Sequence, residues 1–141
     1  MSTLLTDKFT GVTTAGSIDV TGEGNSTTTN LQQGLVKSWV HILGKSTATI
    51  PDSFNVSSLN VVATGIYETA FTNSMANANH CSAGMAREST SDGGNNRLRS
   101  VGFADSSDSI STGQVETVTA YANGSVIDPA TATTITVGEL A

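Results

Sequence analysis

The chain has 141 residues, of which 37% are hydrophobic and only 13% are charged, and its formal net charge is −6. This acidic balance gives no basic stripe for nucleic acid, and no apolar run reaches the ~18 residues of a membrane helix, so we expect neither nucleic-acid binding nor membrane insertion. The 22 Thr and 18 Ser favour strands and turns, because Thr is β-branched and Ser suits turns.

Residues 1–33 are rich in Thr, Gly, Ser and Asn, and their apolar residues are few and widely spaced. Such a segment buries too little surface to order itself alone. It is either a disordered tail or an extended arm that orders by packing on a neighbouring subunit, and we favour the arm, for oligomerisation or docking. No apolar stretch of the signal-peptide kind opens the chain, so we expect synthesis in a cytosol.

From residue 34 onward, the pattern predicts successive strands. The run GLVKSWVHIL at 34–43 has apolar residues on both faces, which indicates a strand that is buried on both sides or pairs with a partner. Residues 46–51 alternate, and we expect Pro51 to end that strand, because proline lacks a backbone donor. The segment 53–71 reads as two strands around Ser57-Ser58 with a bend near Gly65.

The second half continues in the same way. Strands are expected at 78–87, 97–104, 114–122 and 132–140, with polar loops at 88–96 and 105–113. Asn123-Gly124 is the strongest hairpin signal in the chain. Seven or eight short strands over 34–141 predict a β-sandwich, a jelly roll or an open barrel.

Few residues could carry chemistry. His41 lies in an apolar strand, which is more typical of a core or interface residue than of a base. His80 and Cys81 are adjacent, and neighbouring strand residues point to opposite faces, so they do not share a metal easily. A single cysteine gives no disulfide framework. We therefore expect no catalytic residues, no metal, no cofactor and no enzyme activity.

Four segments carry a resemblance: TLLTDKFTGVTTAGSIDVTGEG at 3–24, GLVKSWV at 34–40, IPDSFNVSS at 50–58 and GIYETAFT at 65–72. MANAN at 75–79 and TITVGEL at 134–140 add to them. Together they resemble tail-fibre-like and virion structural proteins of tailed bacteriophages, notably those of marine and cyanobacterial hosts. The resemblance implies a role in the virion and, as in related fibres, a trimeric knob. About 33 residues precede the knob-like part, so we expect neither a fibre shaft nor a tail adaptor.

We therefore expect an all-β protein: a β-sandwich or jelly-roll-like knob at 34–141 with an extended N-terminal arm at 1–33, assembled as a homotrimer. Apolar residues that have too few apolar neighbours in one chain to be buried there are expected to form the subunit interface. These residues are Leu4, Leu5, Ile18, Leu31, Leu35 and Trp39.

The expected function is that of a virion structural protein, either a short fibre, a knob or a capsid decoration subunit, which is assembled in the host cytoplasm. Its expected partners are copies of itself and other capsid or tail proteins. The alternative is a receptor-binding module of a tail fibre that recognises host-surface glycans. The loops at 88–96 and 105–113 contain no aromatic residue for a sugar platform, so such contacts would be polar and would depend on avidity.

Overall fold

The computed structural model describes residues 4–6, 8, 10–12, 18–21, 28–31, 34–87, 99–103 and 109–141. The chain divides into two compact units, Met1–Leu35 and Val36–Ala141. In the first unit, strands β1 (Asp19–Thr21) and β2 (Thr28–Asn30) pair antiparallel. The expected loop at 88–96 and the beginning of the loop at 105–113 lie outside the described residues.

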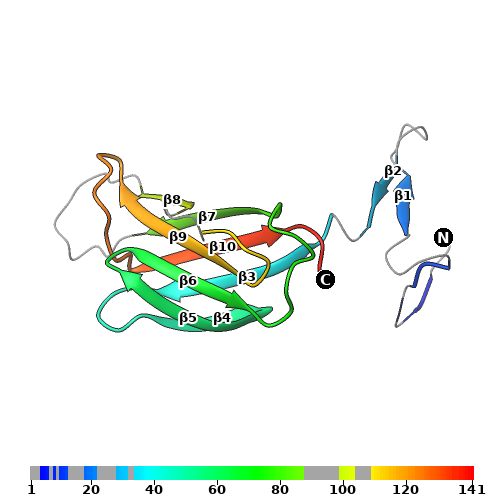
Figure 1. Ribbon diagram of the computed structural model, residues 1–141, viewed down its shortest axis with the longest axis horizontal. Helices are drawn as coiled ribbons and strands as arrows, with labels where there is room; N and C mark the ends of the chain where they lie inside the picture. The colour runs from blue at the N-terminus through cyan, green and yellow to red at the C-terminus, as the bar shows by residue number, and fades with distance from the viewer. Residues whose placement is uncertain are drawn as a thin grey trace. The chain divides into compact units, whose positions relative to one another are not determined.

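The second unit contains two four-stranded antiparallel sheets, drawn as two layers in Figure 1. One has the order β4 (Thr49–Phe54), β3 (Val36–Leu43), β10 (Thr131–Val137), β7 (Cys81–Arg87). The other has the order β5 (Val56–Ala63), β6 (Ile66–Phe71), β9 (Gln114–Tyr121), β8 (Arg99–Phe103). The described residues contain no helix. The all-β prediction is confirmed, and the two sheets are compatible with a β-sandwich.

A small apolar core lies between the sheets. Val40 and Ile42 of β3 pack with Tyr67 of β6, and Phe71 packs with Met75 and Val115 in a second cluster. Around them, five threonines are at most 5% exposed. Hydroxyls of four of them bond within the fold, as in Thr69 Oγ1 to the Val115 carbonyl at 3.2 Å and Thr136 Oγ1 with Ser82 Oγ at 2.7 Å. The five are Thr69, Thr117, Thr119, Thr134 and Thr136.

The chain crosses between the sheets at Asn55, which separates β4 from β5 and has a φ of 57°. This left-handed conformation suits Asn better than most residues. Its Nδ2 donates to the Lys37 and Asn73 carbonyls, both at 3.0 Å, and its Oδ1 accepts from the Asn73 backbone amide at 2.7 Å. The Asn73 side-chain amide donates to the same Oδ1 at 3.1 Å. One side chain therefore fixes the corner.

Two expected strand boundaries are wrong. Pro51 does not end a strand, because β4 runs through it to Phe54. β4 is an edge strand, where a missing backbone donor is tolerated. The break expected at Ser57-Ser58 falls instead at Asn55, and β5 absorbs the serines with a register shift between Val56 and Ser58. The bend at Gly65 is confirmed, with a φ of 69°.

The hairpin expected at Asn123-Gly124 is only half right. The turn forms, with Gly124 at φ 84° and its amide donating to the Tyr121 carbonyl at 2.9 Å. However, β9 and β10 do not pair, because they belong to different sheets. The returning chain makes one bridge, Val126 to Ala120, and then passes through Asp128-Pro129 into the other layer.

Candidate functional site

The outer face of the β4-β3-β10-β7 sheet carries an apolar row. The strand register aligns Phe54 with Trp39, Trp39 with Ile135, and Ile135 with Ala83. Residues opposite each other on paired strands share a face, and Val40, the neighbour of Trp39, is buried in the core. All four side chains therefore point away from the core, and Phe54 and Ile135 are 50% and 48% exposed. We call Phe54, Trp39, Ile135 and Ala83 the apolar row.

Next to the apolar row lies a mixed row of the same face. It aligns Asp52, His41, Thr133 and Met85 from the β4 edge to the β7 edge. Met85 is 78% exposed, which is unusual for a large apolar side chain. Two residues further along β7, Arg87 is exposed at the same edge. The face therefore has an acidic group on one edge strand and a basic group on the other.

His41 is held on this outer face rather than in the core. Its Nε2 lies 2.7 Å from Thr131 Oγ1 on the neighbouring strand β10. This bond ties the imidazole to β10, where Thr133 is the register partner of His41. The sequence pattern left His41 as a core or interface residue, and the structure places it half-buried on the outward face.

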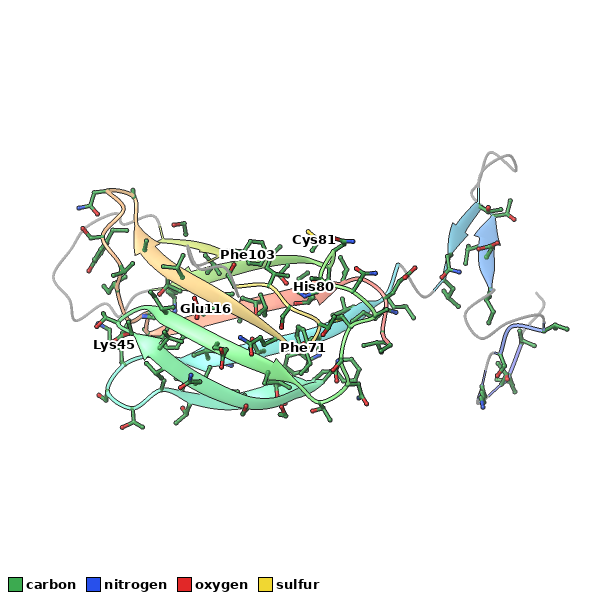
Figure 2. The ribbon with its side chains drawn as sticks, in the orientation of Figure 1. Lys45, Phe71, His80, Cys81, Phe103 and Glu116 are labelled. Carbon is green, nitrogen blue, oxygen red and sulfur yellow. The ribbon has the colours of Figure 1, made fainter. Side chains whose placement is uncertain are left out.

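The outer face of the second sheet carries two acids and two amides beside apolar residues. Glu68 on β6 stands directly opposite Glu116 on β9, and opposite Asn60 on β5. Gln114 Nε2 donates to Glu68 Oε2 at 2.6 Å. Figure 2 labels Glu116, which is 9% exposed. Two acids and two amides give this face hydrogen-bonding groups and negative charge, and Ile66 and Val118 form a half-buried apolar pair further along the same strands.

A hydrogen-bonded lock joins three loops at one end of the sandwich. Tyr67 Oη donates to Asp128 Oδ1 at 2.8 Å, and the Gly65 amide donates to the same oxygen at 2.7 Å. Burial of the phenol, and then the bond to and the charge of Asp128, raise the pKa of Tyr67 far above its ordinary value. Gly44 closes the lock from the β3–β4 turn, with its amide donating to the Pro129 carbonyl at 3.1 Å. This arrangement is structural, because its polar groups are occupied by one another.

His80 and Cys81, adjacent in sequence, have separate environments. His80 is 6% exposed, its Nε2 lies 3.0 Å from the Ser111 carbonyl, and its ring meets Phe71 edge-on with centroids 5.6 Å apart (Figure 2). Cys81 is an exposed free thiol at the start of β7. In the part of the chain that the structure describes, no three His, Cys, Asp or Glu side chains gather to hold a metal.

A shallow hollow lies at the sandwich edge between β7 and β8. Its walls include Ser82, Gly84, Val101, Phe103 and Thr134. Its volume of about 30 Å³ holds roughly one water molecule and is far below the ~300–1,000 Å³ of most small-molecule sites. Among the residues that the structure describes, its three hydroxyls (Ser82, Thr117 and Thr134) have no acid or base in the lining, so the outer face of the β4-β3-β10-β7 sheet is the stronger candidate site.

The structure places the six residues predicted for the interface in two units. Trp39 lies in the second unit, in the apolar row, and the other five lie in the first. Leu4 and Leu5 are 76% and 89% exposed. Ile18 and Leu31 flank the β1–β2 pair and are joined by a 2.8 Å bond from the Leu31 amide to the Ile18 carbonyl. Leu35, at the end of the first unit, is half-exposed.

Three members of the apolar row, Phe54, Ile135 and Ala83, were not predicted as interface residues from the sequence. Phe54 follows a proline and reads as the start of a new segment, and Ile135 is an ordinary member of an alternating strand. Their meeting with Trp39 depends on β3 pairing with both β4 and β10. Nothing local in the sequence encodes that second pairing, which joins strands about 90 residues apart.

Comparison with known proteins gives no relative. No family model matches the chain, and neither a curated protein nor a solved structure matches it. Among the described residues, no helix is long and apolar enough to cross a membrane.

Proposed function

We propose that this protein is a structural subunit of a bacteriophage particle, a short fibre, knob or capsid decoration subunit, which acts by assembling with copies of itself. The observation that carries the assembly role is the apolar row on the outer face of one sheet. Exposed apolar rows are uncommon on monomers and are typical of interaction surfaces. The resemblance of segments 3–24, 34–40, 50–58 and 65–72 to virion structural proteins supports the particle as the place of assembly.

The contrast between the two outer faces supports assembly over catalysis. One face has Trp39, Phe54 and Ile135 side by side, whereas the other has Glu68 and Glu116 with amides. Phe54 and Ile135 are about half exposed on the first face, whereas Glu116 on the second is 9% exposed, which marks the first face as the docking face. The number of copies stays a prediction, and three is the number that the resemblance implies.

The test is made on the phage particle whose genome encodes the chain. Purified virions are analysed by mass spectrometry, and gold-labelled antibody against this chain is located on intact particles. We expect the chain in the virion in many copies per particle. Its absence from washed, infectious particles would refute the proposal.

Deleting the gene separates the possible places on the particle. Particles that adsorb normally but lose DNA on mild heating indicate a capsid decoration subunit. Particles that stay heat-stable but no longer adsorb indicate a fibre, and binding of the purified chain to host glycans would then support the receptor-binding alternative. Polysaccharide hydrolysis by the purified chain would contradict the structural role.

A further inference from the structure

We propose that two copies of this chain pair face to face through the outer faces of their β4-β3-β10-β7 sheets, about a two-fold axis that runs along the strands. This inference deepens the proposed assembly role and rests on it, but it replaces the three copies that the resemblance implies with a two-fold pair. Face-to-face sheets pack with their strands nearly aligned, ~30° apart and ~10 Å between layers. A two-fold axis along the strands gives this packing. Each residue of the second copy lies at the same level along the strands as in the first, and the order of the strands across the sheet is reversed.

The apolar row is complementary in shape to its own reverse. From edge to edge it runs Phe54, Trp39, Ile135, Ala83. Reversed by the axis, the second copy presents Ala83 over Phe54 and Ile135 over Trp39. Each large aromatic side chain therefore meets a smaller aliphatic one, which is the alternation of large and small that lets two layers interdigitate. Two-fold contacts require this kind of self-complementarity.

The charges of the face are complementary under the same axis. Asp52 is exposed on β4, and Arg87 is exposed on β7, at opposite edges of the sheet. The axis places β4 over the partner's β7, so Asp52 faces the position of Met85 in the second copy. Arg87 lies two residues further along that strand, ~7 Å away, which an arginine side chain can span. The pair forms twice, once on each side of the axis.

The sheet edge offers a poorer route to assembly. β4 is the free edge next to β3, and Pro51 in its middle has no amide to donate to an added strand. A continuous sheet across subunits is therefore disfavoured on that side. The face beside it, with Phe54 half-exposed, remains available.

The size of the face sets the strength of the pair. Four strands spaced ~4.8 Å apart, each about 20–25 Å long, give a face on the order of 450 Å² per copy. Pairing then buries about 900 Å² in total, at the low end for specific complexes. We therefore expect a dissociation constant of roughly 10–100 μM for the free chain, and a firmer pair where the particle holds copies close together.

The first test introduces a charge on the face without touching the core. Ala83 is exposed at the β7 edge, so Ala83→Lys leaves the fold intact and places an ammonium over Phe54 of the second copy. Sedimentation velocity of the full chain from about 1 to 300 μM should show a monomer–dimer equilibrium whose dissociation constant rises at least tenfold in the variant. The matched control is Asn60→Lys, which adds the same charge to the outer face of the other sheet and should change nothing.

The second test is a charge exchange. Asp52→Arg and Arg87→Asp should each weaken pairing about three- to tenfold, and the double variant should restore it to within about twofold. A chain that stays monomeric at 300 μM, a trimer mass, or a double variant weaker than both single ones would overturn the two-fold pair. The particle measurements above are independent of these, so the virion role can stand if the pair fails.

Discussion

Asn55 at the sheet crossing provides the sharpest test of how the fold is held. The perturbation is Asn55→Ala, which removes all four side-chain hydrogen bonds of the corner and leaves an alanine in a left-handed conformation. Two partner variants separate the contributions. Asn55→Gly removes the same bonds but fits the backbone, and Asn55→Asp keeps the acceptor but turns an oxygen toward the Lys37 and Asn73 carbonyls.

The magnitude follows from the geometry. A left-handed alanine costs about 1 kcal/mol. The bond to the Lys37 carbonyl is partly buried, so its loss costs about 1–2 kcal/mol, whereas water replaces most of the exposed bonds to Asn73. The free energy of unfolding should fall by roughly 2–3 kcal/mol for Asn55→Ala. Asn55→Gly should be about 0.5–1 kcal/mol better than alanine, because the backbone strain disappears.

The assay is urea unfolding followed by the fluorescence of Trp39, the single tryptophan of the chain. Asn60→Ala, an exposed change on β5, serves as the control and should stay within about 0.5 kcal/mol of the parent. If Asn55→Ala and Asn55→Gly unfold at the same urea concentration, and both free energies of unfolding lie within about 1 kcal/mol of the parent, then Asn55 does not fix the corner.

Three further predictions concern the ends of the sandwich. Gly44→Ala should lower the free energy of unfolding by about 2–4 kcal/mol, because its Cβ would lie 2.8 Å from the Pro129 carbonyl oxygen; thermal unfolding measures the loss. Gly138→Ala should cost about 1–3 kcal/mol in the same assay, since its Cβ would lie 2.8 Å from that of His80. The raised pKa of Tyr67 keeps its phenol protonated in the folded chain while the unfolded chain ionises above about pH 10, so stability falls as the pH rises past 10. Urea unfolding between pH 8 and 11 should show a shallower fall for Tyr67→Phe, and an unchanged slope would refute the assignment.

The strands themselves could be predicted from the sequence. The alternation over 114–122 put Val115, Thr117 and Thr119 on one face, and all three are buried in β9. The run at 34–43 indicated two apolar faces, and the structure buries Val40 and Ile42 of one face in the core and leaves Trp39 on the other. Period-two patterning is a local property, so it survives without knowledge of the fold.

The connections could not be predicted, because they depend on long-range pairing. The crossing at Asn55 needs a left-handed residue with partners on two other segments, and neither partner is near it in sequence. The separation of β9 from β10 overrides the turn signal of Asn123-Gly124, because Asp128 is drawn into the lock with Tyr67. The apolar row could not be predicted for the same reason, because it is complete only when β4, β3, β10 and β7 lie side by side.

The threonine-lined interior has a thermal consequence. Unfolding exposes hydroxyls together with methyl groups at Thr69, Thr117, Thr119, Thr134 and Thr136. Newly hydrated apolar surface increases the heat capacity, and newly hydrated polar surface decreases it. The heat-capacity change of unfolding per residue is therefore smaller for this interior than for an aliphatic one. A small heat-capacity change flattens the dependence of stability on temperature. The free energy of unfolding should therefore change little on either cooling or warming.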